Sequence, residues 1–252
     1  MVAQYKGTEQ WLKAPNGKDT NLTERQWVQV RIPSFKQWFG DWEAVAIQKW
    51  LEGEPVAVAV GDEYKDVSRK NIENAIVEYF ERKGISYAIN PEIGKVNITK
   101  SGIHDSIFKG VGRNKIAAFN YLPQIISRGK VVASNIAWKG REYDTSVIAA
   151  PISIAEEAHV AFVVIRKHAN GDNNFYLHEV GLLKDIKDEA ERINDTGLSP
   201  EGAKETRPFG SIRNIAKRLF SVKPNSASKV VDENGEPLVV YHESPSEFTV
   251  FS

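Results

Sequence analysis

The sequence contains no cysteine. This absence excludes disulfides, thiolate zinc sites and cysteine nucleophiles, and it suits a reducing compartment. Apolar runs of membrane-spanning length are also missing, and residues 1–10 lack the cationic and apolar regions of a signal peptide. An excess of either charge is absent too, because 33 Lys and Arg residues balance 33 Asp and Glu residues. We therefore expect a cytoplasmic chain that contacts no membrane.

The balanced net charge hides a local asymmetry. Residues 95–150 contain nine Lys or Arg residues and three acidic ones, an excess of six positive charges, whereas residues 181–205 contain seven acidic residues and four basic ones. A partner that carries phosphate would prefer the first segment. The alternative is that these charges only face water.

Hydrophobic periodicity predicts helices first and then strands. Aromatic residues at spacings of three and four predict a helix after Ser34, and an apolar stripe predicts another from a Ser68 cap to Gly84. From Lys130 onward the pattern indicates strands, with an Asn-Gly hairpin turn at 170–171. We predict an α+β fold in which N-terminal helices pack on a twisted antiparallel sheet of about four strands, with a small terminal hairpin across Asn234 and Gly235.

The same patterns divide the chain into four parts. The expected parts are an N-terminal arm with an aromatic helix (1–52), an α+β domain (53–183), an acidic helix with a loop and a short helix (184–228), and a C-terminal hairpin that pairs with the N-terminal flank (229–252).

His104 lies at the start of a short predicted helix, where Thr99 or Ser101 is the expected cap. A histidine there either hydrogen bonds a neighbouring carbonyl or takes part in chemistry, since imidazole titrates near neutral pH. Lys109 follows on about the same face and is a candidate cation for a phosphate, although solvation is the usual role of a surface lysine.

Two predicted strands carry polar side chains at alternate positions. Tyr143 and Thr145 share one face of the first strand, and Tyr176 and His178 share one face of the second. If both faces belong to one surface, the sheet presents these groups beside the basic segment. A solvated sheet without function shows the same alternation.

Other kinds of chemistry find little support in the sequence. Residues 110–115 contain two glycines but lack the spacing and the ending of a phosphate-binding loop. Histidines and acids show no metal-ligand spacing, and neither a nucleophile elbow nor a carboxylate pair is present. We expect no metal and no cofactor.

Three stretches, ITKSGIHDSIFKGVGRNKIAAFNYLPQII, KGREYDTSVIAAPISI and NNFYLHEV, resemble the third of the large polyvalent protein-associated domains of phages and mobile elements. The resemblance spans about residues 56–183. The order of elements also resembles the barnase/EndoU/colicin/RelE group of metal-independent ribonucleases.

The flanks resemble the lead-in of phage ADP-ribosyltransferases. The stretches NLTERQWVQVRIPSFKQWFGDWE and SKVVDENGEPLVVYH carry this likeness, and in that family the first strand ends in a histidine, usually as YHGT. Here the tail reads YHES, and the later strands of that family do not follow. We expect His242 to be a vestige or the edge of a truncation rather than a working NAD ligand.

The ribonuclease resemblance implies an acid and base pair, for which we assign His104 and His178 in either order. Lys109 and Arg141 would stabilise the phosphate, while the hydroxyl side chains would position it. The expected partner of the chain is single-stranded or loop RNA, from tRNA or mRNA, on which the chain would act as a toxin. The candidate site residues are His104, His178, Lys109, Arg141, Tyr143, Thr145 and Tyr176.

Two other functions remain open. A non-enzymatic module could bind and block a host defence protein or be held by an immunity protein, and exposed tyrosines would then anchor the interface. The third is a remnant of an ADP-ribosyltransferase.

Overall fold

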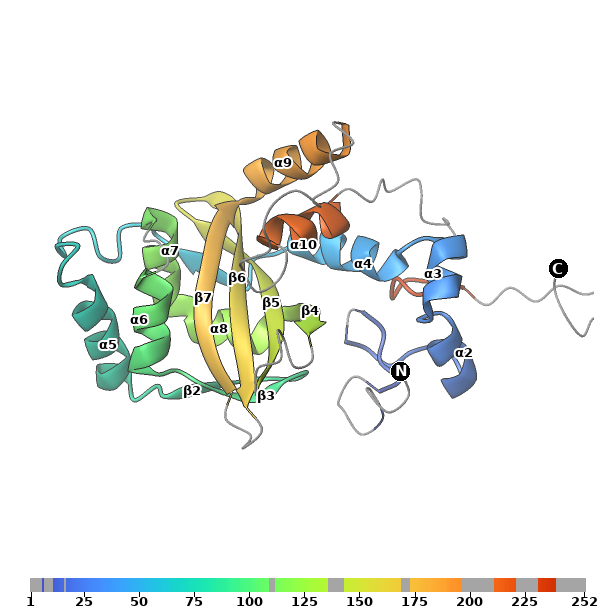
Figure 1. Ribbon diagram of the computed structural model, residues 1–252, viewed down its shortest axis with the longest axis horizontal. Helices are drawn as coiled ribbons and strands as arrows, with labels where there is room; N and C mark the ends of the chain where they lie inside the picture. Colours follow the sequence, from blue (N-terminus) through green and yellow to red (C-terminus); the bar gives the residue numbers. More distant parts are fainter. Residues whose placement is uncertain are drawn as a thin grey trace, which may run out of the picture.

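The computed structural model of the chain (Figure 1) describes residues 6, 11–15, 17–108, 112–135, 143–168, 173–195, 211–220 and 231–238, without the side chains of 135, 143, 191–195 and 211–213. Its helices are α2 (Glu24–Gln29), α3 (Pro33–Phe39), α4 (Trp42–Leu51), α5 (Ile72–Lys83), α6 (Lys100–Phe108), α7 (Arg113–Ala118), α8 (Leu122–Arg128), α9 (Leu183–Asp195) and α10 (Ser211–Phe220), with a 3₁₀ turn η1 (Phe119–Tyr121). Its strands are β1 (Ala57–Ala59), β2 (Tyr87–Asn90), β3 (Gly94–Asn97), β4 (Lys130–Asn135), β5 (Tyr143–Ile154), β6 (Glu157–His168) and β7 (Asn173–Leu182).

The α+β class is confirmed, but the sheet is larger than predicted. Seven strands form one sheet in the order β1-β5-β6-β7-β3-β2, with β4 also paired to β5. The antiparallel meander β5–β6–β7 forms its centre, while β1 joins β5 and β3 joins β7 in parallel, so the sheet is mixed. The prediction of about four antiparallel strands missed these edges because nothing in a short strand identifies a partner 77 or 95 residues away.

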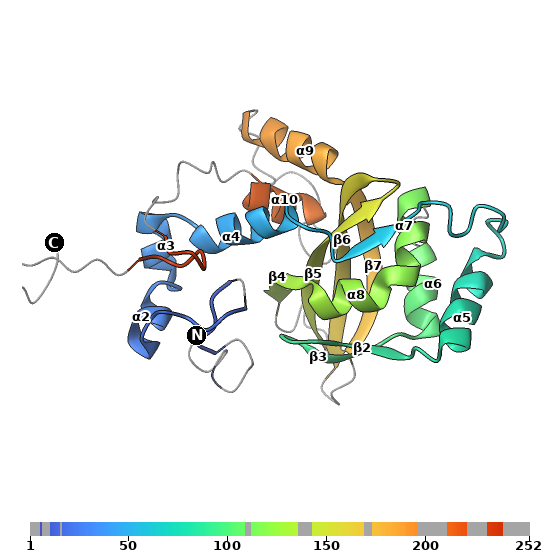
Figure 2. The same ribbon diagram turned by 180° about the vertical axis from the view of Figure 1, so that it is seen from behind.

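Both faces of the meander are buried. The first core lies between the sheet and α5 to α8, and the second core lies between the sheet and α4, α9 and α10. Figure 2 shows α8 across the strands on the face that Figure 1 hides. Successive side chains of a strand alternate between faces, and helices cover both faces here, so β6 is buried at every position from His159 to Ile165.

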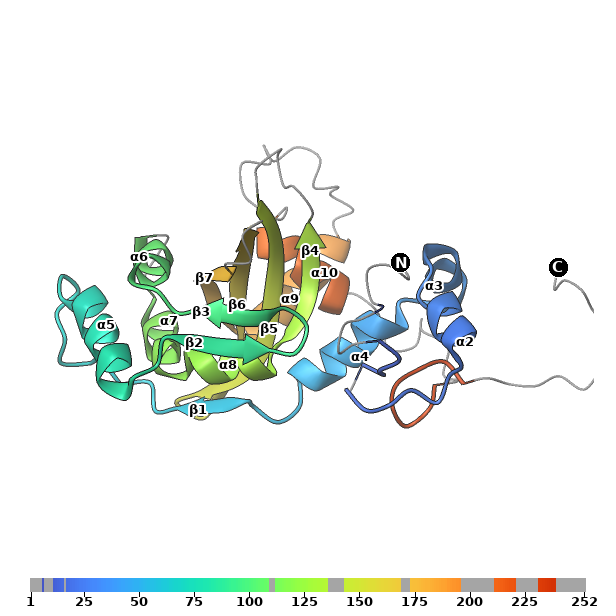
Figure 3. The same cartoon turned by 90° about the horizontal axis from the view of Figure 1, so that it is seen from below.

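The β2–β3 hairpin is tied across the end of the sheet through Asn90. The completely buried Asn90 side chain donates to the Ile126 carbonyl at 2.7 Å and to the Gly129 carbonyl at 2.9 Å. Beside it, the Glu92 carboxylate accepts the Val131 N–H at 3.1 Å. These bonds hold the hairpin against α8 and the start of β4, and Figure 3 shows it running across the meander strands.

Helix α5 ends where the sequence predicts but begins later. Gly84 adopts φ 65°, and the Ile85 N–H bonds to the Phe80 carbonyl, which is the αL cap that glycine favours. The helix begins at Ile72 rather than after Ser68, because residues 68–71 form a turn in which the Asn71 N–H bonds to the Ser68 carbonyl.

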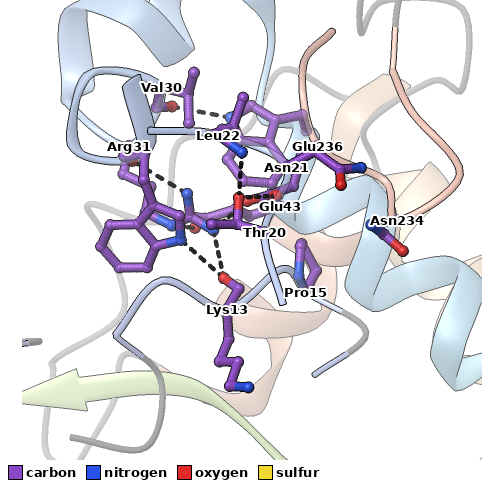
Figure 4. Close-up of polar contacts among 12 residues, drawn as sticks. Lys13, Pro15, Thr20, Asn21, Leu22, Val30, Arg31, Glu43, Asn234 and Glu236 are labelled. Atoms are coloured by element: carbon purple, nitrogen blue, oxygen red, sulfur yellow. Dashed lines mark hydrogen bonds and ion pairs between the residues drawn. The ribbon is translucent and has the colours of Figure 1, made fainter. Parts of the chain in front are cut away.

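The two flanks of the chain meet around one arginine (Figure 4). The Arg31 guanidinium lies 3.8 Å from the Trp27 ring centre and 4.9 Å from that of Trp42. It bonds to the completely buried Glu236 carboxylate at 2.9 Å and lies 3.3 Å from Glu43. Residues more than 200 positions apart thus share one buried ion pair.

Hydroxyl and backbone groups complete this Arg31 network. The Thr20 hydroxyl donates to the second oxygen of Glu236, while Trp27 Nε1 and Arg31 both donate to the Lys13 carbonyl. Gly235, at φ 80°, forms the tight turn that carries Glu236, as the Asn-Gly pair predicts. Residues 239–252, including His242, lie outside the described residues.

Tyr64 should make the stability of the fold sensitive to alkali. Its hydroxyl donates to Asn120 Oδ1, and burial raises the pKa of this phenol above its usual value of about 10. The unfolded chain therefore loses this proton first, so the free energy of unfolding should fall as pH rises above about 10. In Tyr64→Phe the fall should be shallower, as measured by urea unfolding between pH 8 and 11, with Tyr87→Phe as the control. Equal slopes would contradict the prediction.

Candidate functional site

Helix α6 lies directly on β7, and this contact turns His104 outward. The Thr99 hydroxyl accepts the Gly102 N–H at 3.1 Å and so caps the start of the helix, as the sequence predicts. Ser106 then fixes the inner face, since its hydroxyl donates to the Gly102 carbonyl at 2.5 Å and accepts the Leu177 N–H at 2.8 Å. His104 lies on the opposite face of the helix.

Gly102 permits this close approach. A Cβ at this position would lie 2.7 Å from both Cε1 and the carbonyl oxygen of Phe175. Gly102→Ala should therefore displace α6 and lower the free energy of unfolding by about 1–3 kcal/mol. Urea unfolding checks this, with Gly112→Ala as the control because nothing lies within 4 Å of a Cβ there. An unchanged midpoint for Gly102→Ala would show that the contact is not tight.

His104 forms a solvent-accessible pair with Glu73 at the start of α5. Its Nδ1 lies 2.9 Å from Glu73 Oε2, and 58% of the His104 side chain is exposed. The imidazole also stacks on Phe108, with ring centres 6.2 Å apart and planes at 20°, and Phe108 is 83% exposed. The carboxylate fixes one ring nitrogen, so that Nε2 is the nitrogen available to a ligand.

The neighbouring Asp105 points to the sheet instead. Its carboxylate accepts a bond from Arg166 at 3.0 Å, and the Arg166 guanidinium lies 5.2 Å from the Tyr176 ring centre. Asp105 is therefore occupied in holding α6 to β6.

The predicted hydroxyl groups of the sheet lie in the interior. Tyr176 is 1% exposed and belongs to the second core beneath α9 and α10. Thr145 is 2% exposed, and its Oγ1 has no hydrogen-bond partner among the described residues. The alternating pattern located these side chains on one face but could not show that helices cover that face.

His178 occupies a β-bulge in β7. Leu177 pairs with Val163 and Glu179 pairs with Phe162, which leaves His178 as the extra residue. Its ring packs edge-on against Tyr176 at 5.5 Å, whereas its carbonyl accepts a bond from Lys115 at 3.1 Å.

The structure therefore does not bring the two assigned imidazoles together. His104 lies on the layer of α5 and α6, and His178 packs on Tyr176 in the second core, across the sheet. Tyr143 starts β5, where it pairs with His168, but its side chain lies outside the described part. Lys109 and Arg141 also lie outside it.

Glu73 is the site residue that the sequence did not reveal. It lies in the first turn of α5, where an acidic residue is also expected simply to complement the helix dipole. Its pairing with His104, 31 positions later, depends on how two helices pack, and no local pattern carries that information.

The described residues show no grouping of three His, Asp or Glu side chains that could hold a metal ion. No helix within the described ranges has the length and apolar character needed to cross a membrane.

Comparisons with known proteins match the central part of the chain. Searches of curated proteins and of solved structures found no match. The likeness to the ribonuclease group and to the ADP-ribosyltransferase flanks stays a prediction. Residues 63–176, which include both Glu73 and His104, match the family described as large polyvalent protein-associated domain 3, so this part of the chain is similar to a phage-related polyvalent protein module.

Proposed function

We propose that the chain is a phage or mobile-element effector that cleaves single-stranded RNA without a metal, at His104. The supporting observation is the pair of His104 and Glu73, which is open to solvent and stacked on an exposed aromatic ring. In this revised site Glu73 is the partner of His104, and His178, whose ring packs on Tyr176, has no role.

The chemistry follows from these two side chains. His104 Nε2 accepts the proton of a ribose 2′-hydroxyl, and the 2′-oxygen attacks the adjacent phosphorus. The bond from phosphorus to the 5′-oxygen breaks, and the leaving oxygen takes a proton from water, which reaches this open site. Glu73 holds the ring and stabilises the imidazolium that forms, as a carboxylate does beside a catalytic histidine. The products are a 2′,3′-cyclic phosphate and a 5′-hydroxyl.

Recognition of single-stranded RNA rests on Phe108. An exposed aromatic ring offers a surface on which an unpaired base can stack, and such stacking is tolerant of sequence. The basic segment 95–150, which contains α6 and α7, supplies the attraction for the backbone.

A cleavage assay on total RNA in excess EDTA tests this proposal. We expect fragments that end in 2′,3′-cyclic phosphate, and His104→Ala should abolish most of them. If the purified chain leaves RNA intact but retains one host protein in stoichiometric amount, the RNA proposal fails and the protein-blocking module replaces it.

A further inference from the structure

A small hollow is lined by residues of the segment that precedes α5, by the first residue of α5 and by helix α7. Its volume is about 250 Å³. Ile72, the residue before Glu73, forms part of its wall. The charged residues that line it are Glu63, Lys65, Arg69 and Arg113.

The acidic groups near the hollow are already engaged. Glu63 accepts the N–H groups of Val60 and Gly61 at 2.8 and 2.9 Å, and the Tyr121 hydroxyl donates to it at 3.3 Å. Asp62 bonds to Lys65 at 2.8 Å. The Lys65 charge is therefore largely balanced by Asp62, whereas the carboxylate of Glu63 is turned to the backbone.

Neither arginine forms an ion pair with the described residues, although Arg113, after Lys65, helps to lower the pKa of Asp62. Arg69 is exposed and forms neither a hydrogen bond nor an ion pair with the described residues. Arg113 donates through Nε to the Gly61 carbonyl at 3.2 Å, which orients the guanidinium, and its terminal nitrogens contact no acceptor within the described ranges. Guanidinium groups recognise phosphate oxygens with paired donors, and two of them line this one hollow.

The other walls of the hollow are mainly apolar. Val67, Ile72, Ile116 and Ala117 line it. Pockets for small ligands combine apolar walls with a few polar groups and usually measure about 300–1,000 Å³, so this hollow, at about 250 Å³, lies just below that range and fits one part of a ligand rather than a whole nucleotide. An inorganic anion alone would leave the apolar wall unused.

We infer that this hollow binds the phosphate group of a nucleotide, with Arg69 and Arg113 on the phosphate and the apolar residues against the sugar or base. The nucleotide is either free in solution or part of an RNA strand that also reaches His104. Binding at the hollow does not require cleavage at His104, so the inference stands or falls separately from the proposed function.

Calorimetry with adenosine and uridine 5′-monophosphates, and with inorganic phosphate, tests the free ligand. Fluorescence anisotropy with a labelled single-stranded RNA measures binding of an RNA strand, in a His104→Ala background that prevents cleavage.

Arg69→Ala should weaken binding about 10- to 100-fold, because each charge-assisted bond contributes strongly. Lys70→Ala, which changes the adjacent residue outside the hollow, is the matched control and should change little.

The outcomes distinguish a free nucleotide from an RNA strand as the source of the bound phosphate. Saturable binding of a monophosphate that depends on Arg69 identifies a free nucleotide, and binding of RNA alone with the same dependence identifies a backbone phosphate. Binding that does not depend on Arg69, no binding of either ligand, or binding of inorganic phosphate as tight as that of a nucleotide overturns the inference. Nucleotide binding by a chain that cannot cleave RNA would refute only the proposed function.

Discussion

His104→Ala is expected to lower the rate of RNA cleavage by about 10²- to 10⁴-fold, the usual contribution of one general acid–base group. The effect should fall on the chemical step, because the exposed Phe108 and the basic segment remain to bind RNA. Single-turnover measurements with a labelled single-stranded RNA in EDTA would separate the cleavage rate from binding.

Glu73→Gln should cause a smaller loss than His104→Ala. Glutamine keeps a hydrogen-bonding side chain near Nδ1 but removes the charge that stabilises the imidazolium. Glu78→Gln is the matched control, since Glu78 lies further along α5. If His104→Ala cleaves as fast as the native chain, any cleavage originates elsewhere.

Arg31→Met is expected to lower the free energy of unfolding by about 3–5 kcal/mol, the usual cost of removing one partner from a buried ion pair. The substitution leaves the Glu236 carboxylate completely buried, with the Thr20 hydroxyl as the remaining side chain that contacts it among the described residues. It also removes the cation that lies between the Trp27 and Trp42 rings.

Urea unfolding followed by tryptophan fluorescence would measure this loss, because Trp27 and Trp42 lie in the network. Arg25→Met, on the exposed face of α2, is the control and should change stability by less than about 0.5 kcal/mol. The double variant Arg31→Met/Glu236→Gln should lose less than the sum of the two single variants, since the residues are coupled. A loss below about 1 kcal/mol for Arg31→Met would show that water reaches the pair.

Local patterns predicted the elements of the fold better than their partners. The period of the apolar residues and Gly84 identified α5, alternation identified the strands of the meander, and an Asn-Gly pair identified the turn before Glu236. The Asn-Gly pair at 170–171 lies outside the described residues. These features depend on residues a few positions apart. The attachment of β1 and β3 to the meander depends on residues far apart, and the sequence pattern did not predict it.

The candidate site shows the same division. The helix start before His104 was predictable because such a start has a local signature, which offered Thr99 or Ser101 as the cap, and the structure selects Thr99. The burial of the sheet face was not predictable, because Tyr176 and Thr145 follow the polar alternation of a solvent-exposed strand and yet are buried. Whether such a face is exposed to solvent depends on whether α9 and α10, which follow later in the chain, cover it.

The outermost strands of the sheet also affect the tendency of the chain to aggregate through its sheet edges. On one side the sheet ends at β1, which has three residues, and at β4, which has six residues and a β-bulge between Val131 and Ala133, and on the other side it ends at β2, which has four residues. Short strands and bulges leave a neighbouring molecule few regularly spaced N–H and C=O groups with which to extend the sheet. Such brevity protects a β-rich chain from stacking into fibres, even though Val58 and Ile89 are exposed there.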